Sequence, residues 1–256
     1  MRTPDELRAL VESYLGELAL TPELHGQAES VRYAVEVGGK RVRPVLVLAT
    51  AEAAGAEPEA ALPAAAALEL VHTFSLVHDD LPALDNDETR RGQPSAWKRY
   101  GEAVAILAGD ALLAEAFRLA LSYPTTSVGR ELAQATLGMI GGQYLDITGT
   151  EPDEATLHKL KTGCLFSASV GLALWVAEVP EREQPRWRAF GDELGLLFQI
   201  VDDILDGDGY VLAHGADGAR RLADAAAERA QARLAEVDAD TSVLEEIVAG
   251  LAARTS

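Results

Sequence analysis

Two aspartate-rich clusters interrupt apolar stretches of this chain. The first contains Asp79, Asp80 and Asp85, and the second contains Asp202, Asp203 and Asp206. Carboxylates on an apolar helix repel one another and lose hydration, so they destabilise the fold unless a cation or water compensates them. Mg²⁺ prefers oxygen ligands and typically bridges one or two carboxylates to substrate phosphates. Together the clusters predict metal-ligating aspartates and a phosphate-bearing substrate, although either one alone is also typical of an acid-rich, solvated helix end.

The spacing within each cluster determines which carboxylates can share a metal. Asp202 lies four residues before the last aspartate of its cluster, so the two share one helix face, and Gln199 lies one turn before them. Asp79 and Asp85 are six residues apart and would lie on different faces of an ideal helix. Pro82 removes a helix hydrogen bond between them and kinks the chain. We therefore expect the carboxylates of Asp79 and Asp85 to converge.

Basic residues gather beside two glycine-containing segments. These segments are Gly38-Gly39-Lys40-Arg41-Val42-Arg43-Pro44 and Arg90-Arg91-Gly92. Glycine lets the backbone approach a ligand closely, and Lys and Arg side chains recognise phosphate through charge-assisted hydrogen bonds. Either segment alone is also typical of a solvated loop. In a chain this acidic, they favour an anion-binding site close to the aspartate clusters.

Composition excludes several classes of function. The chain has 256 residues with 48% hydrophobic content, which suffices for one large domain or two small ones. Its 41 acidic and 22 basic residues give a net charge of −19, which argues against nucleic acid or an anionic membrane as the main partner. The single Cys164 excludes an internal disulfide. With no secretory pattern and no apolar run as long as a membrane span, we expect a cytoplasmic protein that is not embedded in a membrane.

Hydrophobic periodicity predicts an all-α protein. Apolar residues recur at three- and four-residue spacing over residues 4–20, 59–81, 101–122, 129–147, 155–178, 185–206 and 217–235. We find no convincing alternating strand and no break long enough to be a domain linker. Segments such as 63–78 are apolar nearly all round, which is typical of helices buried inside a bundle. These features predict a single helical domain.

Taken in order, these segments resemble the trans-isoprenyl diphosphate synthases of the polyprenyl synthetase family. The matching motifs are the basic segment at 38–44, Asp79-Asp80-x4-Asp85 followed by Arg90-Arg91-Gly92, Leu107-Ala108-Gly109-Asp110, Gly141-Gly142-Gln143-Tyr144-Leu145-Asp146, Lys161-Thr162-Gly163, and Phe198-Gln199-x2-Asp202-Asp203-x2-Asp206. Their order and spacing over residues 38–206 leave little room for coincidence.

The resemblance implies a bundle of roughly antiparallel helices around a central cavity, usually in a homodimer. The two aspartate motifs would face each other across the mouth of the cavity. In that family an allylic diphosphate loses its diphosphate to three Mg²⁺ ions, for which Mn²⁺ is an alternative. Isopentenyl diphosphate then attacks the resulting carbocation.

The resemblance also implies a role for each residue that matches a motif. Asp79, Asp85 and Asp202 would hold the metals, with Asp80, Asp203 and Asp206 as supporting groups. Lys40, Arg43, His72 and Arg91 would bind isopentenyl diphosphate. Arg90, Lys161, Thr162 and Gln199 would contact the allylic substrate, and the Thr162 and Gln199 side chains would also stabilise positive charge during catalysis. A lone histidine on an apolar helix is otherwise more often a core residue.

Three functions compete: a chain-elongating prenyltransferase, a class I terpene cyclase, and a weakly active or inactive subunit of a heteromeric synthase. The second aspartate motif argues against the cyclase, since cyclases of that class usually carry an Asn/Asp, Ser/Thr, Glu motif there. A partner subunit would be free to lose carboxylates, but all six are present. We therefore expect a prenyltransferase.

Two residues beside the first aspartate motif bear on product length. Ser75 lies one turn before Asp79 on the same helix face, with Phe74 beside it. An aromatic ring there would block a growing chain early. Together with the two-residue insertion in the first aspartate motif, Phe74 resembles bacterial-type farnesyl diphosphate synthases and predicts a C15 product, with the geranylgeranyl product as the alternative.

The sequence departs from the family after Asp206. Members usually continue with a lysine-containing loop, whereas no lysine follows Lys161 in this chain. We therefore expect one polyprenyl synthetase domain over 1–256 that is shortened after residue 206. The glycines of residues 207–218 predict a mobile and poorly specified segment there.

Overall fold

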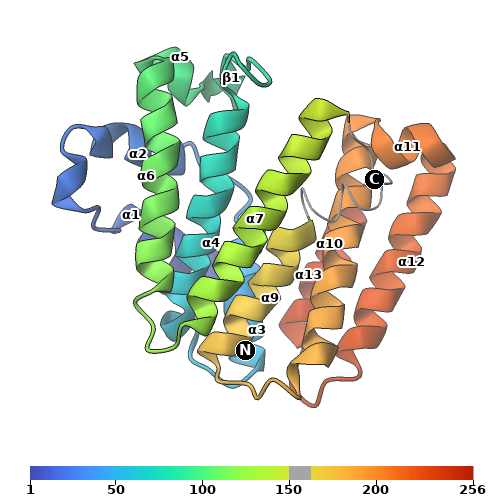
Figure 1. Cartoon of the computed structure of the whole chain (residues 1–256). Coiled ribbons are helices and arrows are strands. Elements are labelled where there is room, and N and C mark those ends of the chain that lie inside the picture. Colours follow the sequence, from blue (N-terminus) through green and yellow to red (C-terminus); the bar gives the residue numbers. More distant parts are fainter. Residues whose placement is uncertain (150–162, 256) are drawn as a thin grey trace.

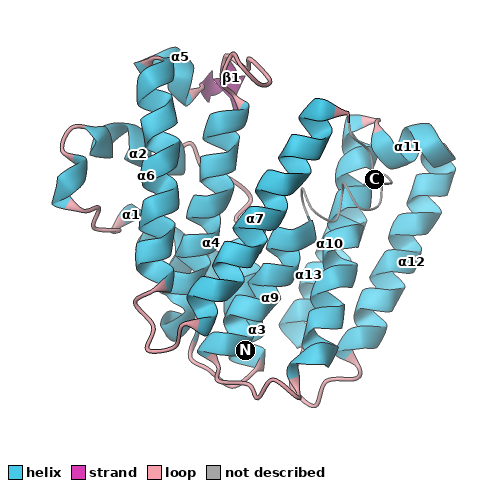
Figure 2. Cartoon of the chain, viewed as in Figure 1, coloured by secondary structure: helices cyan, strands magenta, loops and turns pink. Residues whose placement is uncertain are grey.

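Helices make up nearly all of the secondary structure in a computed structural model of the chain, which describes residues 1–149 and 163–255 (Figure 2). In chain order the elements are α1 (Pro4–Gly16), η1 (Pro22–Leu24), α2 (Gln27–Glu36), α3 (Val42–Ala53), α4 (Pro58–Asp79), β1 (Thr89–Arg90), β2 (Gln93–Pro94), α5 (Ala96–Tyr100), α6 (Glu102–Ala120), α7 (Ser127–Thr148), α9 (Cys164–Val176), α10 (Gln184–Asp206), α11 (Gly209–His214), α12 (Ala216–Leu234), α13 (Ser242–Ala252) and η3 (Ala253–Thr255). The predicted all-α class is confirmed.

The long helices match the predicted segments. α1, α4, α6, α7, α9, α10 and α12 fall within or close to the seven predicted ranges. Residues 155–162 of the predicted range 155–178 lie outside the described residues. The predicted ranges do not include α2, α3, α5, α11 or α13, which are shorter than the helices that were predicted.

Helix α4 forms the centre of the bundle. It packs against α3, α6 and α9, and Figure 1 shows α4, α9 and α10 between α6 and α12. By length and composition α4 could cross a membrane, with a mean hydropathy of 1.5 over 18 residues, so the prediction that no apolar run reaches that length was wrong. The same window is 67% buried inside the bundle. Its apolar character is thus explained by its place in the core.

Helices α9 and α10 approach closely through glycine. A Cβ at Gly195 would lie 3.2 Å from the Cα of Gly163 and 3.2 Å from the Cβ of Phe166. The absence of that atom lets the Phe166 and Phe198 rings pack with their centroids 4.5 Å apart. This contact fixes the C-terminal half of α10, which carries the second aspartate cluster.

A short β-hairpin, with two residues in each strand, follows the first aspartate cluster. β1 and β2 pair antiparallel, with Thr89 opposite Pro94 and Arg90 opposite Gln93. The turn between them holds Arg91 at φ 54° and Gly92 at φ 78°, as a tight hairpin turn requires. The sequence predicted no strand in this region, because two residues are too few to show alternation.

The glycine-rich segment after α10 also differs from its prediction. Instead of a poorly specified loop, residues Gly209–His214 form helix α11. The Asp203 carboxylate accepts a hydrogen bond of 2.9 Å from the backbone N–H of Tyr210 in its first turn. A side chain from the preceding helix therefore specifies the conformation of this segment.

The packing of α4 predicts a large effect of truncating one of its leucines. Leu68 is fully buried, whereas Leu212 of α11 is 79% exposed. We expect Leu68→Ala to lower the free energy of unfolding by about 2–5 kcal/mol, because it removes buried surface and leaves a cavity. Leu212→Ala, the matched control, should change it by less than about 0.5 kcal/mol. Urea denaturation of both variants measures the difference, and equal effects would contradict this view of the core.

Candidate active site

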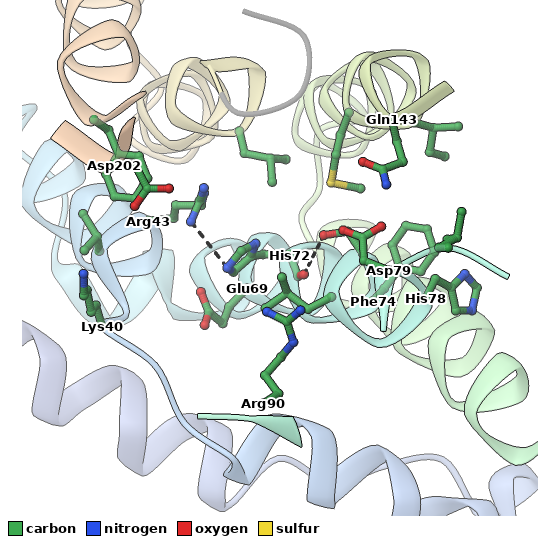
Figure 3. A pocket seen from close by; sticks show the side chains of 18 of the residues that line it. Lys40, Arg43, Glu69, His72, Phe74, His78, Asp79, Arg90, Gln143 and Asp202 are labelled. Carbon is green, nitrogen blue, oxygen red and sulfur yellow. Dashed lines mark hydrogen bonds between the residues drawn. The ribbon is translucent and has the colours of Figure 1, made fainter. Parts of the chain in front are cut away.

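A cavity of about 710 Å³ opens between α3, α4, α7 and α10 (Figure 3). A volume of this size suits a small organic substrate. The sequence-predicted residues that line it are Lys40, Arg43, His72, Phe74, Ser75, Asp79, Arg90, Arg91 and Asp202. Lys161 and Thr162 lie outside the described residues, so their predicted roles stay predictions.

One aspartate of each cluster lines the cavity, and the two lie on opposite sides of it. Asp79 ends α4 and Asp202 lies near the end of α10, and Figure 3 shows the two carboxylates across the cavity from each other. The turn after α4 folds back, so the Asp85 N–H donates to the Asp79 carbonyl at 2.9 Å. The backbones of the two residues thus meet because the helix ends at Asp79 and not because Pro82 kinks it, while the convergence of their carboxylates stays a prediction. Asp85 and Asp206 are exposed and are not among the residues that line the cavity.

The second aspartate of the first cluster points away from the cavity. Asp80 is 2% exposed, and its two carboxylate oxygens accept hydrogen bonds of 2.8 and 2.9 Å from Arg90 Nε. Arg90 Nη2 adds a contact of 2.5 Å. Because this bidentate pair occupies Asp80, the residue anchors the β1–β2 hairpin to α4 in this structure. Its predicted support of a metal, and the predicted substrate contact of Arg90, stay predictions.

The second aspartate of the second cluster is also turned away. Asp203 is 4% exposed, and it accepts a hydrogen bond of 2.6 Å from Gln199 Nε2 in addition to the one from the Tyr210 backbone. Neither Asp203 nor Gln199 lines the cavity. The structure places both beside the site, where they connect α10 to α11, and their contacts with metal or substrate stay predictions.

Lys40, Arg43 and Arg91 line the cavity and form its cationic group, in which Arg43 contacts two aromatic rings. Its guanidinium carbon lies 4.7 Å from the centroid of the Phe166 ring and 5.3 Å from that of Phe198, so both rings favour its charge. Arg43 Nη1 is 3.5 Å from His72 Nε2. Arg43 Nε is buried and has no hydrogen-bond partner. A buried N–H donor without an acceptor is costly, and an anion in the cavity would relieve that cost.

His72 is neutral beside these cations. Burial, reinforced by Arg43 and Arg91, lowers the pKa of His72 well below its ordinary value. Because an arginine can only donate, His72 Nε2 accepts from Arg43 and the ring proton resides on Nδ1. The histidine therefore orients Arg43 without adding a further positive charge.

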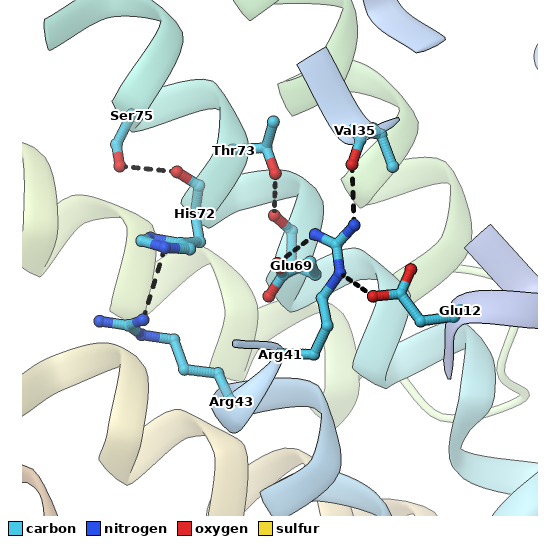
Figure 4. Close-up of polar contacts among 8 residues, drawn as sticks. All are labelled: Glu12, Val35, Arg41, Arg43, Glu69, His72, Thr73 and Ser75. Atoms are coloured by element: carbon cyan, nitrogen blue, oxygen red, sulfur yellow. Dashed lines mark hydrogen bonds and ion pairs between the residues drawn. The ribbon is translucent and has the colours of Figure 1, made fainter. Parts of the chain in front are cut away.

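A buried carboxylate supports the cationic group from behind (Figure 4). Glu69 of α4 is 3% exposed, and its Oε1 lies 2.6 Å from Arg41 Nη1. Arg41 also pairs with Glu12 at 2.9 Å and donates to the Val35 carbonyl at 2.7 Å. Sequence reasoning missed Glu69. The available signal was its isolation, since it is the one charged residue between positions 60 and 71.

Arg91 packs directly against the glycine pair. A Cβ at Gly39 would lie 2.4 Å from Arg91 Nη1, a distance at which the guanidinium would have to move. The absent side chain of Gly39 thus makes room for Arg91 beside Lys40. The sequence predicted a close approach at these glycines, and the structure shows that the approaching group includes an arginine of the chain itself.

Another part of the cavity is apolar. Phe74 lies in its wall and packs edge-on against His78 with ring centroids 5.0 Å apart. Helix α7 contributes the opposite wall through Met139, Ile140, Gln143, Tyr144 and Ile147. The sequence singled out 141–146 as a motif without assigning it a role. Its apolar neighbours at three- and four-residue spacing were the signal that could have identified this wall.

The carboxylates fit a metal that is shared with a ligand. Within residues 1–149 and 163–255, no three His, Cys, Asp or Glu side chains are already gathered to hold an ion. Asp79 and Asp202 present oxygen ligands from opposite sides of one cavity. This donor set suits Mg²⁺, which keeps several waters and is completed by substrate phosphates more often than by an all-protein cage.

Comparisons with known proteins agree with this geometry. Residues 26–216 match the sequence model of the family described as "Polyprenyl synthetase". The chain is 45% identical to the large subunit 1 of a heterodimeric geranylgeranyl pyrophosphate synthase of Arabidopsis thaliana, over 70% of this chain and 53% of that protein. It is 39% identical to farnesyl diphosphate synthase of Bacillus subtilis, over 71% of this chain and 66% of that protein. The chain thus spans between about half and two thirds of the length of the curated relatives it matches.

A solved structure is similar over nearly the whole chain. The geranyltransferase of Legionella pneumophila superposes with a TM-score of 0.87 at 32% sequence identity. The match covers 98% of this chain and 96% of the other. The arrangement of helices around the cavity is therefore shared with a protein of known structure.

The raised pKa of Asp202 predicts that removing its charge stabilises the metal-free protein at neutral pH. Burial and repulsion from Asp206 raise the pKa of Asp202, although Lys40 and Arg43 oppose the shift. Its protonated form therefore stabilises the fold at low pH, and this contribution is lost as the pH rises through the raised pKa. We expect Asp202→Asn to raise the Tm of the metal-free protein at pH 7, with the gain vanishing below about pH 3.9, the ordinary pKa of an aspartate.

Differential scanning calorimetry in a chelating buffer between acid and neutral pH tests this expectation. The exposed Asp208→Asn serves as the control for the loss of one carboxylate. A lower Tm for Asp202→Asn at pH 7 would show that the Asp202 charge stabilises the metal-free fold.

Proposed function

Because the chain belongs to the polyprenyl synthetase family, we propose that it is a trans-prenyltransferase that condenses isopentenyl diphosphate with a short allylic diphosphate. The observation that carries the proposal is that three kinds of groups line one cavity. Asp79 and Asp202 present carboxylates, Lys40, Arg43 and Arg91 present cations, and Phe74 and α7 present apolar surface. Each kind of group matches one portion of the two substrates.

The cationic group suits the diphosphate of isopentenyl diphosphate. Arg43 offers an unpartnered Nε–H, held in place by neutral His72 and by two phenyl rings. Lys40 is exposed at the entrance, and Arg91 packs against Gly39. Charge-assisted hydrogen bonds from these donors would bind the diphosphate and orient the hydrocarbon toward the carboxylate side.

The carboxylates suit the diphosphate of the allylic substrate through metal. Asp79 and Asp202 would hold Mg²⁺, with the exposed Asp85 and Asp206 of the same clusters as further ligands. The metal supplies electrostatic stabilisation of the leaving diphosphate. Lining residues Phe74, Met139 and Ile140 would surround the hydrocarbon and keep water away from developing positive charge.

A homodimer is part of this proposal. Ile106 and Leu107 of α6 and Leu137 of the neighbouring α7 are large hydrophobic residues that are exposed and do not border the cavity. An exposed apolar face of this kind is typical of an interaction surface. The cytoplasmic location expected from the sequence remains a prediction.

A steady-state assay tests the function directly. Purified protein is incubated with Mg²⁺, geranyl diphosphate and isopentenyl diphosphate, and the released pyrophosphate and the prenyl product are measured. We expect condensation that stops when the metal is chelated. A folded protein without condensation would favour an inactive subunit of a heteromeric synthase. The name of the Arabidopsis relative describes a heterodimeric synthase.

Removing a cavity carboxylate should abolish most activity. We expect Asp79→Ala and Asp202→Ala to lower kcat/KM by orders of magnitude, because each leaves the substrate diphosphate without a metal that compensates its charge. Circular dichroism should show unchanged helix content. Asp208→Ala, which removes an exposed aspartate just beyond the cluster, is the control and should retain activity. Near-normal kcat/KM in either cavity variant would refute the metal assignment.

The position of Phe74 predicts the product. We expect a C15 product from the wild-type protein and longer chains from Phe74→Ala, because the truncation enlarges the apolar part of the cavity. Phe117→Ala, an aromatic truncation on α6 outside the cavity wall, is the control and should leave chain length unchanged. Chromatographic sizing of products made from dimethylallyl and isopentenyl diphosphates decides the question. Mainly C20 or longer chains from the wild type would contradict the farnesyl assignment.

A further inference from the structure

Glu69 is a buried acidic residue beside the cationic group. Its side chain is 4% exposed, yet it borders the cavity together with Arg43, His72 and Arg91. A buried carboxylate is costly unless it is paired. Its direct partner is Arg41, whose side chain is 3% exposed. Glu69 therefore places one buried negative charge next to the cations of the cavity.

All three guanidinium nitrogens of Arg41 donate hydrogen bonds. Nε bonds Glu12, Nη1 bonds Glu69 and Nη2 bonds the Val35 carbonyl. The backbone of Arg41 has φ 49°, a left-handed conformation that a non-glycine residue adopts at a cost. The side-chain contacts thus stabilise a strained residue at the start of α3. Lys40 and Arg43 flank that residue, so their placement depends on it.

Glu69 also acts electrostatically on two further cations, Arg43 and Arg91. Burial lowers the pKa of Arg43, and Glu69 is the strongest influence that opposes the shift. Glu69 likewise opposes the lowered pKa of Arg91. Without this carboxylate, Arg41, Arg43 and Arg91 would repel one another with less compensation. Side chains under such repulsion would spread toward solvent.

We propose that Glu69 is a positioning residue that keeps the cations at 40–43 and Arg91 assembled for a diphosphate before the diphosphate arrives. The inference rests on the proposed function for the identity of the ligand. It does not require turnover, because diphosphate binding can be measured alone. Two opposite effects compete when Glu69 is removed: the ligand loses a repelling charge, and the cations lose their arrangement. The proposal commits to the second effect as the larger one.

The test is binding of inorganic pyrophosphate to the full chain by isothermal titration calorimetry. A metal-free buffer of fixed ionic strength is used, since without Mg²⁺ the aspartate side of the cavity repels the ligand. We expect Glu69→Gln to raise the Kd for pyrophosphate at least tenfold, and Glu69→Asp, which keeps the charge, to recover part of the loss. In steady-state assays the KM for isopentenyl diphosphate should rise by a similar factor, with a smaller change in kcat.

Glu115→Gln provides the matched control. Glu115 of α6 is also 3% exposed and paired with an arginine, Arg118, but it does not border the cavity. We expect it to lower the Tm while leaving the Kd for pyrophosphate unchanged. If both variants weaken binding equally, Glu69 has only a general structural role and the proposal fails.

The remaining outcomes are equally decisive. Unchanged or tighter binding of pyrophosphate by Glu69→Gln would show that repulsion dominates and would overturn the proposal. If Glu69→Gln does not fold, Glu12→Gln removes the other carboxylate of Arg41, which is 48% exposed. That variant should raise the Kd by a smaller factor, and no change would overturn the proposal. A wild-type protein that binds pyrophosphate without turnover would remove the proposed function alone.

Discussion

Helix α4 has to be buried on nearly every side and still present polar groups to one cavity. It meets this constraint through spacing. Glu69, His72, Leu76 and Asp79 follow one another at intervals of three, four and three residues and all border the cavity. These intervals keep them on one helix face. The rest of the helix is left free for apolar packing, and α3, α6 and α9 cover it.

The charges of the site are balanced across this face. Glu69 at one end meets the guanidinium groups, and Asp79 at the other lies beside no cation of the 38–44 segment (Figure 3). Asp202 is influenced by Lys40 and Arg43 but retains a raised pKa. The protein thus pairs Arg41 with its own carboxylates, while the cavity carboxylate of Asp202 keeps a raised pKa. Such an arrangement suits a site where the missing positive charge arrives with the ligand.

Sequence reasoning identified the long helices because they depend on local spacing, whereas the facing positions of the two aspartate motifs were implied by the family resemblance. Hydrophobic periodicity fixed α4 and α10 within a few residues, and motif order identified Asp79 and Asp202. The partners of Asp80 and Asp203 could not be predicted in this way. Each partner, Arg90 or Tyr210, becomes a neighbour only after a turn has formed. Helix α11 was missed for the same reason, since its first turn is completed by a side chain of α10.

In both clusters the two adjacent aspartates, Asp79 and Asp80 or Asp202 and Asp203, have different roles. Adjacent residues on a helix point about 100° apart, so one carboxylate of a pair can border the cavity while its neighbour contacts another segment. In each cluster the first, Asp79 or Asp202, borders the cavity. The second, Asp80 or Asp203, is buried and binds the segment that follows, through Arg90 of β1 or the Tyr210 backbone of α11. Losing a second aspartate would therefore release a neighbouring segment, whereas losing a first would remove a charge from the cavity itself.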